Sequence, residues 1–483
     1  MSNQEQPAGK MWSGRFREPL DKDFEQWQRS FPFDWRLFQA EISASIAHAR
    51  AIEAAGILTA EEAEKMCAGL RALGKLDVNA RSIYDSAAPF AKSAETAEDV
   101  HHFVELELTR EVGDLALKLH TGRSRNEQIA TDMRLFVRGV IDAAITSLRT
   151  WATALTGVAE AAGENVMPSY THLQRAEPVL VAHWLLAYVA MIERDITRLA
   201  DARKRMNLCP LGSGAIAGAT LKLDRTIAAR ELGFDGPTPN SMDATSDRDF
   251  LLEFTQAAAT IGIHASRFAE EITLFSTAEY GFVELPEAFS TGSSAMPQKK
   301  NPDLTELVRG KSARLIGAQT ALSTLIKGLP LAYNKDLQEA QEQVFDAADT
   351  LTGMLALLPK FTAALKFNYA RMKTAATTGY LNAMAAATYL SNKGVPFRKA
   401  HEIVGHAVRL GLESGRELND LKIEELRKLS DAFAEDFYSA ISLEATLDCH
   451  DVAGGTARTR VAEALAAARQ RLEDNKASRP ANK

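Results

Sequence analysis

The sequence predicts an all-α protein, with a long central helical bundle and a smaller helical domain at each end. Proline, which ends or kinks helices, is absent between Pro89 and Pro168, between Pro239 and Pro286, and between Pro359 and Pro396. Residues 164–211 contain no glycine. Short alternating runs of β-branched and aromatic residues, the usual strand signal, are nearly absent. We expect an N-terminal helical domain at 1–122, the long bundle at 123–373 and a C-terminal helical domain at 374–483.

The first elements to justify are two long helices of the predicted bundle. Between residues 128 and 164 the apolar residues recur at steps of three and four, as on one face of a helix. Between residues 250 and 275 they recur at nearly heptad steps, as in helical bundles. At 1.5 Å per residue such helices run about 45 to 55 Å and need partners of similar length.

A third segment, Val179–Met191, is apolar nearly all round. A surface helix would show one apolar stripe, so we expect this one to be buried on every side. We expect it inside a bundle shared between subunits; the alternative is an interior helix of a monomer.

Length and composition fit this architecture and exclude several classes of protein. The chain has 483 residues, enough for about three domains of roughly 150 residues, and its 46% hydrophobic and 25% charged residues are typical of a globular protein. The formal net charge of −7 disfavours a polyanion, and no basic patch is obvious, so we expect no nucleic-acid partner.

The expected compartment is cytoplasmic. Cys67, Cys209 and Cys449 are widely spaced and odd in number, which fits neither a disulfide framework nor a metal-binding pair. Met1–Lys10 is polar and lacks the apolar stretch of a secretory signal. The longest apolar run, Val179–Ile192, has 14 residues, whereas a bilayer span needs about 20, so we expect no membrane segment.

Polar segments that interrupt the helices are the candidate functional sites, because loops can direct side chains and free N–H groups at a ligand. Thr121–Glu127 contains Arg123, Arg125 and Asn126 and suits a carboxylate or phosphate. The alternative is a helix-capping segment with solvated arginines. Ser169–Pro178 is expected to be a polar turn leading into the buried helix, with His172 either an acid/base group or structural.

Two further interruptions lie later in the chain. Glu284–Asp303 is rich in small residues and lysine, so it is either a mobile lid that closes over an anion or a flexible linker. Leu329–Glu339 is a short break before another helix and is uninformative alone.

His101, His102, Glu105 and Glu107 are side chains of the types that ligate metal ions. His101 and Glu105 share a helix face, but no third ligand is clear, so no metal is predicted. The chain contains no Walker loop, dinucleotide fingerprint, HExxH or nucleophile-elbow motif.

The segment Gly292–Pro302 matches the signature SSxMPxKxN of the fumarase/aspartase superfamily. The other three polar segments, Thr121–Glu127, Ser169–Pro178 and Leu329–Glu339, fall in the order and at the distances expected of this superfamily. With Lys10–Phe16, the segments TGRSRN and YNKDLQE and the run QKKNPD, they resemble the argininosuccinate lyase family. The resemblance extends from about residue 10 to beyond residue 460.

The resemblance implies a homotetramer in which loops of three subunits build each active site. It implies no cofactor and no metal. The implied reaction is the reversible cleavage of argininosuccinate to fumarate and L-arginine, the final step of arginine biosynthesis.

By the same resemblance, Ser293 and His172 form the acid/base pair. We favour Ser293 as the group that takes the proton, but the opposite direction stays open. The dianion formed beside a carboxylate needs fixed donors and cations, for which Lys299, Asn301 and Thr171 are the candidates.

The resemblance also assigns substrate binding. Arg123, Asn126 and Ser30 would hold carboxylate and amino groups, with Tyr333 and Gln338 on the arginine portion. Asp99 and His101 match an active-site pair in an EDxH pattern, which replaces the metal interpretation. Gln341 is a departure, because the family frequently has lysine there, and it bears on how one end of the substrate is held; Glu127 stands where aspartate is usual.

Two other functions remain open from the sequence. One is another fumarate-releasing lyase of the superfamily, acting on a different N-substituted aspartate, on aspartate or on malate. The other is a structural protein like the δ-crystallins related to this family; the retained Ser293, His172 and Lys299 argue against it.

Overall fold

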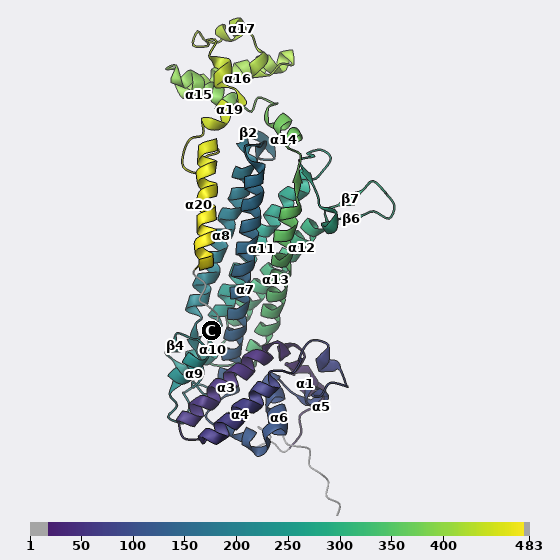
Figure 1. Cartoon of the computed structure of the whole chain (residues 1–483), viewed down its shortest axis with the longest axis vertical. Helices are drawn as coiled ribbons and strands as arrows, with labels where there is room; N and C mark the ends of the chain where they lie inside the picture. Colours follow the sequence, from purple (N-terminus) through teal and green to yellow (C-terminus); the bar gives the residue numbers. More distant parts are fainter. Residues whose placement is uncertain (1–17, 478–483) are drawn as a thin grey trace, which may run out of the picture. The chain divides into compact units, whose positions relative to one another are not determined.

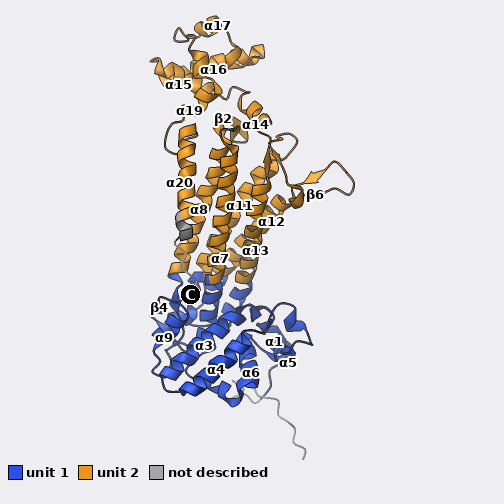
Figure 2. Cartoon of the chain, in the orientation of Figure 1, with its two compact units in different colours: residues 1–138, 205–250, 324–342 blue, residues 139–204, 251–323, 343–483 orange. Residues whose placement is uncertain are grey.

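The computed structural model describes residues 18–477 and confirms the all-α prediction. The sequence segment Lys10–Phe16 lies outside the described residues. The chain divides into two compact units, each built from several stretches of sequence (Figure 2). Unit 1 comprises residues 1–138, 205–250 and 324–342, and unit 2 comprises residues 139–204, 251–323 and 343–483.

Unit 1 is built from short and medium helices around a cluster of aromatic rings. Its helices are α1 (Lys22–Trp27), α2 (Phe31–Asp34), α3 (Phe38–Ala54), α4 (Ala60–Leu73), α5 (Ala91–Thr96), α6 (Val100–Val112), α9 (Arg225–Glu231) and α10 (Ser241–Ser246). The ring of Phe103 on α6 stacks on Phe31 at 4.7 Å and meets Phe38 and Phe90 edge-on. These contacts fix α6 against α2 and α3, the helices that carry part of the candidate site.

Two helix starts in unit 1 have clear sequence causes. Thr59 caps α4 in a capping box with Glu62, each side chain bonding the other's backbone N–H. Asp99 caps α6 by accepting a hydrogen bond from the N–H of His102. The second cap places Asp99 and His101 side by side at the N-terminus of α6.

Long helices dominate unit 2, and Figure 1 shows them running side by side. They are α7 (Arg125–Ala162), α8 (Val181–Arg205), α11 (Asp249–Phe275), α12 (Asp303–Ile326), α13 (Glu339–Ala364) and α20 (Arg458–Ala477), some of which begin or end in unit 1. The helices predicted over 128–164 and 250–275 are confirmed as α7 and α11. Pro359 lies inside α13 and does not end this helix.

Aromatic side chains join the long helices of unit 2. Trp151 on α7 meets Phe268 on α11 edge-on at 5.5 Å, and Phe268 meets Tyr188 on α8 at 5.2 Å. The Trp151 indole N–H donates to Oγ1 of Thr362 on α13 at 3.0 Å. One buried indole therefore links three helices.

The expectation of a polar turn at Ser169–Pro178 is confirmed only for His172 and Leu173, and strands occupy the rest of the segment. The structure has an antiparallel hairpin there, β1 (Val166–Thr171) and β2 (Gln174–Leu180), and helix α8 begins only at Val181. His172 and Leu173 form its two-residue turn with φ of 54° and 57°, as a type I′ turn requires. This turn lacks the usual glycine or asparagine, so no hairpin was predictable from its residues.

Helix α8 is not buried on every side within one chain. Leu185 and Ile192 are buried, whereas Leu186 and Met191 are half-buried and Ala190 is exposed. The shared bundle stays a prediction. No helix in residues 18–477 is long and apolar enough to cross a membrane.

The remaining elements are small. The last helices are α14 (Tyr369–Ala376), α15 (Ala383–Asn392), α16 (Phe397–Ser414), α17 (Ile423–Arg427), α18 (Phe437–Ala440) and α19 (Leu443–Asp448), and α15 to α18 share an apolar core that includes Leu390, Phe433 and Phe437. Short strand pairs are β3 (Leu208–Cys209) with β4 (Gly236–Pro237), β5 (Val283–Glu284) with β8 (Lys366–Phe367), and β6 (Thr291–Gly292) with β7 (Lys300–Asn301). All three cysteines are free, as their spacing predicted.

Candidate active site

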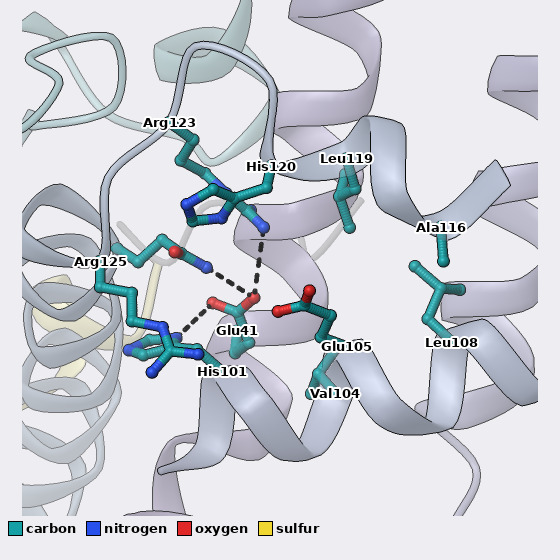
Figure 3. Close-up of a pocket in the computed structure, with 11 residues that line it drawn as sticks. Glu41, His101, Val104, Glu105, Leu108, Ala116, Leu119, His120, Arg123 and Arg125 are labelled. Carbon is teal, nitrogen blue, oxygen red and sulfur yellow. Dashed lines mark hydrogen bonds and ion pairs between the residues drawn. The ribbon is translucent and has the colours of Figure 1, made fainter. Parts of the chain in front are cut away.

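A buried cluster in unit 1 surrounds His101 (Figure 3). Nδ1 of His101 on α6 lies 3.0 Å from Oε2 of Glu41 on α3 and 3.6 Å from Oδ2 of Asp132 on α7. The exposed fractions of the three residues are 6%, 1% and 0%. Three helices thus bring together an imidazole and two carboxyl groups away from solvent.

The charges in this cluster determine which groups carry protons. Burial opposes charge on Glu41, but the charges of His101 and Arg123 outweigh it and lower the pKa of Glu41 to about 2. Burial also opposes charge on His101, but Glu41 raises its pKa overall. Burial and the neighbouring Glu41 raise the pKa of Asp132 well above its usual value. These shifts favour Glu41 as the anion, His101 as the cation and Asp132 as the neutral group.

The ligand atoms of Glu41, His101 and Asp132 lie within 4.8 Å of one another, close enough to hold a metal ion. Two facts favour protons instead. The Arg123 guanidinium lies 3.9 Å from Oε1 of Glu41 and would repel a divalent cation. Burial and the nearby Glu41 raise the pKa of Asp132, so a proton can offset its charge, although neither of its buried oxygens has a hydrogen-bond partner among the described residues. Glu41 and Asp132 were not predicted as partners of His101, because they lie on other helices, far from it in the sequence.

Ser30 and Asp99, both predicted to bind substrate, lie near His101 in unit 1. Oγ of Ser30 donates to Oδ2 of Asp34 at 2.6 Å, and Oδ1 of Asp34 accepts from the N–H of Val100 at 3.0 Å. Burial and the charge of Asp99 raise the pKa of Asp34 to about 7. The carboxylate of Asp99 accepts a hydrogen bond from Arg125 at 2.9 Å. The start of α6 therefore gathers three of the predicted residues.

Arg123 is directed into unit 1. Its Nη1 donates to Oγ of Ser45 at 2.9 Å, and its side chain is 4% exposed. The amide of Asn126 donates to the carbonyl of Ala215 at 3.2 Å. A cavity of about 710 Å³ adjoins this segment, lined by His120, Arg123, Ser124, Arg125 and the glycine-rich stretch 214–220. The anion-binding interpretation of residues 121–127 stays a prediction.

The predicted residues near position 335 also belong to unit 1. Nε2 of Gln338 donates to the carbonyl of Gln28 at 3.1 Å. Burial and the acidic charges of Asp99 and Asp34 raise the pKa of Tyr333, while Arg248 opposes the shift. Gln341 is buried and its Oε1 has no hydrogen-bond partner. Tyr333 therefore lies in the field of the carboxyl groups at the start of α6.

The signature loop of unit 2 connects β6 and β7 and extends away from the long helices of its unit (Figure 1). Oγ of Ser293 accepts hydrogen bonds from the N–H groups of Ala295 at 3.2 Å and Met296 at 3.1 Å. Lys299 is exposed, and the amide of Asn301 donates to Oγ1 of Thr291 at 3.3 Å. Donors from the loop itself thus fix the Ser293 hydroxyl oxygen.

Thr171 and His172 lie at the exposed end of the β1–β2 hairpin, also in unit 2. A cavity of about 480 Å³ lies beside this end, lined by Tyr170, Leu173, Gln174, Arg175, Glu279 and Tyr280 among others. In the described part of the chain no hydrogen bond or ion pair joins His172 to Ser293. The two predicted acid/base residues are not brought into contact within unit 2.

Family models match most of the chain. A lyase family model matches residues 14–317, and an argininosuccinate lyase C-terminal model matches residues 380–448. Argininosuccinate lyase of Acidobacterium capsulatum is 62% identical over 465 residues, covering 96% of this chain and 95% of the relative. Argininosuccinate lyase of Koribacter versatilis is 55% identical over 463 residues, covering 96% and 97%.

Solved structures agree on the fold. An EDDS lyase variant with bound fumarate has a TM-score of 0.80 at 25% identity, covering 95% of this chain and 92% of that one. A fumarate lyase from Mesorhizobium sp. BNC1 has a TM-score of 0.71 at 18% identity, covering 94% and 100%, and supports the fold alone. The chain belongs to the argininosuccinate lyase family, within the fumarase/aspartase superfamily.

Proposed function

We propose that this chain catalyses the reversible cleavage of argininosuccinate to fumarate and L-arginine, the last step of arginine biosynthesis. The observation that carries the proposal is the 62% identity, over nearly the whole of both chains, to an argininosuccinate lyase. Retention of the loop Gly292–Pro302 with its serines and lysines supports it.

The hardest step is removal of a proton beside a carboxylate, because the carbanion adds a second negative charge to that group. In this proposal Ser293 takes the proton. A serine hydroxyl is a weak base unless its alkoxide is stabilised, and the two N–H groups that donate to Ser293 Oγ provide such stabilisation. Lys299 on the same loop supplies positive charge for the dianion.

The departing guanidino nitrogen needs a proton, which we assign to His172. Thr171, beside it at the end of the hairpin, and Asn301 on the β6–β7 hairpin would donate to the substrate carboxylates. Ser30, Asp99, His101, Arg123, Asn126, Tyr333, Gln338 and Gln341 are proposed to bind the rest of the substrate. The proposal needs no metal or cofactor, because side chains of the chain supply the acid, the base and the charge.

We also propose a cytoplasmic homotetramer whose active sites are shared between subunits. The outward extension of the β6–β7 loop and the half-buried apolar residues of α8 support sharing, because both lack full partners within unit 2. We also propose that each chain of the assembled enzyme has three domains, at residues 1–122, 123–373 and 374–483.

Replacing Ser293 with alanine tests the function. Loss of a general base costs about a hundred- to ten-thousandfold in rate, so we expect S293A to reduce kcat by at least a hundredfold. The measurement is the ultraviolet absorption of fumarate released from argininosuccinate by chelator-treated protein.

Ser290→Ala, in the same segment, is the matched control and should retain activity, because Ser290 only donates to the carbonyl of Pro286. The proposal fails if the parent protein leaves argininosuccinate intact but releases fumarate from aspartate or malate. It also fails, as to Ser293, if S293A works as well as the parent.

A further inference from the structure

The imidazole of His101 has one nitrogen fully engaged and one without a partner. Nδ1 lies at hydrogen-bond distance from Glu41, whereas the buried Nε2 has no hydrogen-bond partner. A buried N–H donor without a partner destabilises a folded protein unless a ligand accepts a hydrogen bond from it. His101 also lines the pocket of Figure 3, which leaves room for a group about the size of one water molecule.

Glu41 is held rigidly opposite His101. Its Oε1 accepts hydrogen bonds from Oγ of Ser45 at 2.6 Å and from Nε2 of Gln128 at 3.1 Å, and Oε2 faces His101. Figure 3 shows the carboxylate of Glu41 between His101 and Arg123. The carboxylate can therefore neither rotate freely nor move away from the imidazole.

Asp132 completes the arrangement as a neutral group. Two carboxylates facing one imidazole would repel each other in this buried setting. Carrying a proton, Asp132 adds no second negative charge, and Glu41 is the neighbouring carboxyl towards which its hydroxyl can donate. The cluster then has one anion, Glu41, matched to the cation His101.

The other charged groups that act on His101 come from neighbouring elements. They are Asp34 on α2, Asp99 before α6, His120 at the end of the short helix 113–120, and Arg125 on α7. Burial and the nearby Arg123 lower the pKa of His120 to about 4, so it is neutral. The pocket lining then presents His101, Arg123 and Arg125 as cations beside the carboxyl groups of Glu41 and Glu105. Burial raises the pKa of Glu105, which weakens its negative charge, so the lining favours an anionic group of a ligand.

We propose that Glu41 and Asp132 are positioning residues for His101, which they hold as a charged donor with its Nε2–H directed at a carboxylate of the substrate. This inference rests on the proposed function and deepens it. Neither residue touches the substrate; each acts through the orientation and charge of His101.

The first test is Glu41→Gln, which keeps the shape of the side chain and removes its charge. The KM for argininosuccinate should rise at least tenfold while kcat falls less than threefold, because a binding contact is weakened. The upper limb of the pH profile of kcat/KM should move to lower pH by about one unit, since the imidazole loses its proton more readily. Glu107→Gln, on α6 and also buried, beside Ser93 and Arg110, is the matched control and should change neither quantity.

The second test separates the donor role of Asp132 from a structural role. Asp132→Ala removes the donor to Glu41 and should raise KM at least fivefold. Asp132→Asn keeps an N–H donor in its place and should recover most of that loss. Equal losses in the two variants would show that Asp132 does not act as a neutral donor and would overturn its assignment.

A third measurement does not depend on activity or on a folded Glu41 variant. The parent protein with 13C-labelled histidine, compared with His101→Asn, gives the titration of His101 by NMR. A midpoint above the ordinary value of 6.5 supports the inference, and a midpoint at or below it overturns it. Activity of the parent on argininosuccinate is scored separately, so failure of the proposed function is distinguished from failure of this inference. An unchanged KM and pH profile in folded E41Q would also overturn it.

Discussion

At the scale of single residues, unit 1 contains a buried acidic side chain, Asp34, that no ion pair of the described residues neutralises. Asp34 is 1% exposed and accepts hydrogen bonds from Ser30 and Val100, yet no cation among residues 18–477 forms an ion pair with it. Two neutral donors do not compensate for the loss of hydration, so the pKa of Asp34 rises to about 7. Asp34 thus changes charge near neutral pH while it holds the hydroxyl of Ser30.

Replacing Asp34 with asparagine should flatten the pH dependence of stability. The pKa of Asp34 is about 7 in the folded protein and near 3.8 when unfolded, so the folded state binds its proton more tightly. Its stabilising effect is complete below pH 3.8 and is lost as the pH rises towards 7. Asparagine cannot ionise, so the free energy of unfolding of D34N should fall less than that of the parent between pH 4 and pH 8. At about 1.4 kcal/mol per pKa unit, the difference should be at most about 4 kcal/mol.

Urea unfolding at several pH values checks this prediction. Asp77→Asn, at an exposed position of the same unit, is the control and should follow the parent at every pH. If the free energies of unfolding of D34N and the parent changed in parallel between pH 4 and pH 8, Asp34 would be ionised over that whole range.

At the scale of elements, long periodic helices were predictable and short polar structure was not. The nearly heptad spacing of apolar residues over 250–275 predicted α11 (Asp249–Phe275), because apolar periodicity directly indicates which face of a helix packs. The β1–β2 hairpin was missed, because its turn residues His172 and Leu173 carry no turn signal and tertiary packing imposes their conformation.

The same contrast applies to the candidate site. The loops that carry Ser293, His172 and Arg123 stand out as polar interruptions of apolar helices. Glu41 and Asp132 lie within helical patterns, where an acidic residue usually marks the solvent face. Only packing of α3, α6 and α7 shows that these two acids face His101.

The turn of the hairpin offers an element-scale prediction. Leu173 is exposed and has φ of 57°, a conformation that costs a residue with a side chain about 1 to 2 kcal/mol. Leu173→Gly should relieve this strain and raise the free energy of unfolding by about 1 kcal/mol, part of the gain being offset by the freer unfolded chain. Leu173→Val, which is β-branched, should lower it.

Thermal unfolding of the three proteins at one pH provides the measurement. Leu117→Gly is the control, because Leu117 is also exposed but lies in the short helix 113–120, where glycine should destabilise. A lower melting temperature for L173G than for the parent would contradict the strained turn.

At the scale of the whole molecule, the proposed reaction requires residues from both units. Ser30, Asp99, His101, Arg123 and Tyr333 belong to unit 1, whereas Thr171, His172, Ser293 and Lys299 belong to unit 2. Ser293 and His172 have no contact with each other within unit 2. Association of several copies would supply these missing contacts, which is the physical reason to expect an assembly.

The long helices of unit 2 carry apolar side chains that one chain leaves uncovered. Ile263 on α11, Ile316 on α12 and Leu357 on α13 are each 41% to 46% exposed. Burying such side chains contributes roughly 25 cal/mol for each Å² removed from water, which favours association with further copies. Light scattering should therefore report a mass four times that of the chain.

Ile263→Lys tests whether this surface makes the assembly. A charge at the centre of an apolar interface would remain unpaired, so I263K should shift the protein to smaller species and reduce argininosuccinate cleavage, with the helical circular dichroism unchanged. Leu412→Lys, at an exposed position of α16, is the control and should keep the mass of the parent. A parent protein that stays monomeric at micromolar concentration while cleaving argininosuccinate would rule out shared active sites, because one chain would then have to bring Ser293 and His172 together by itself.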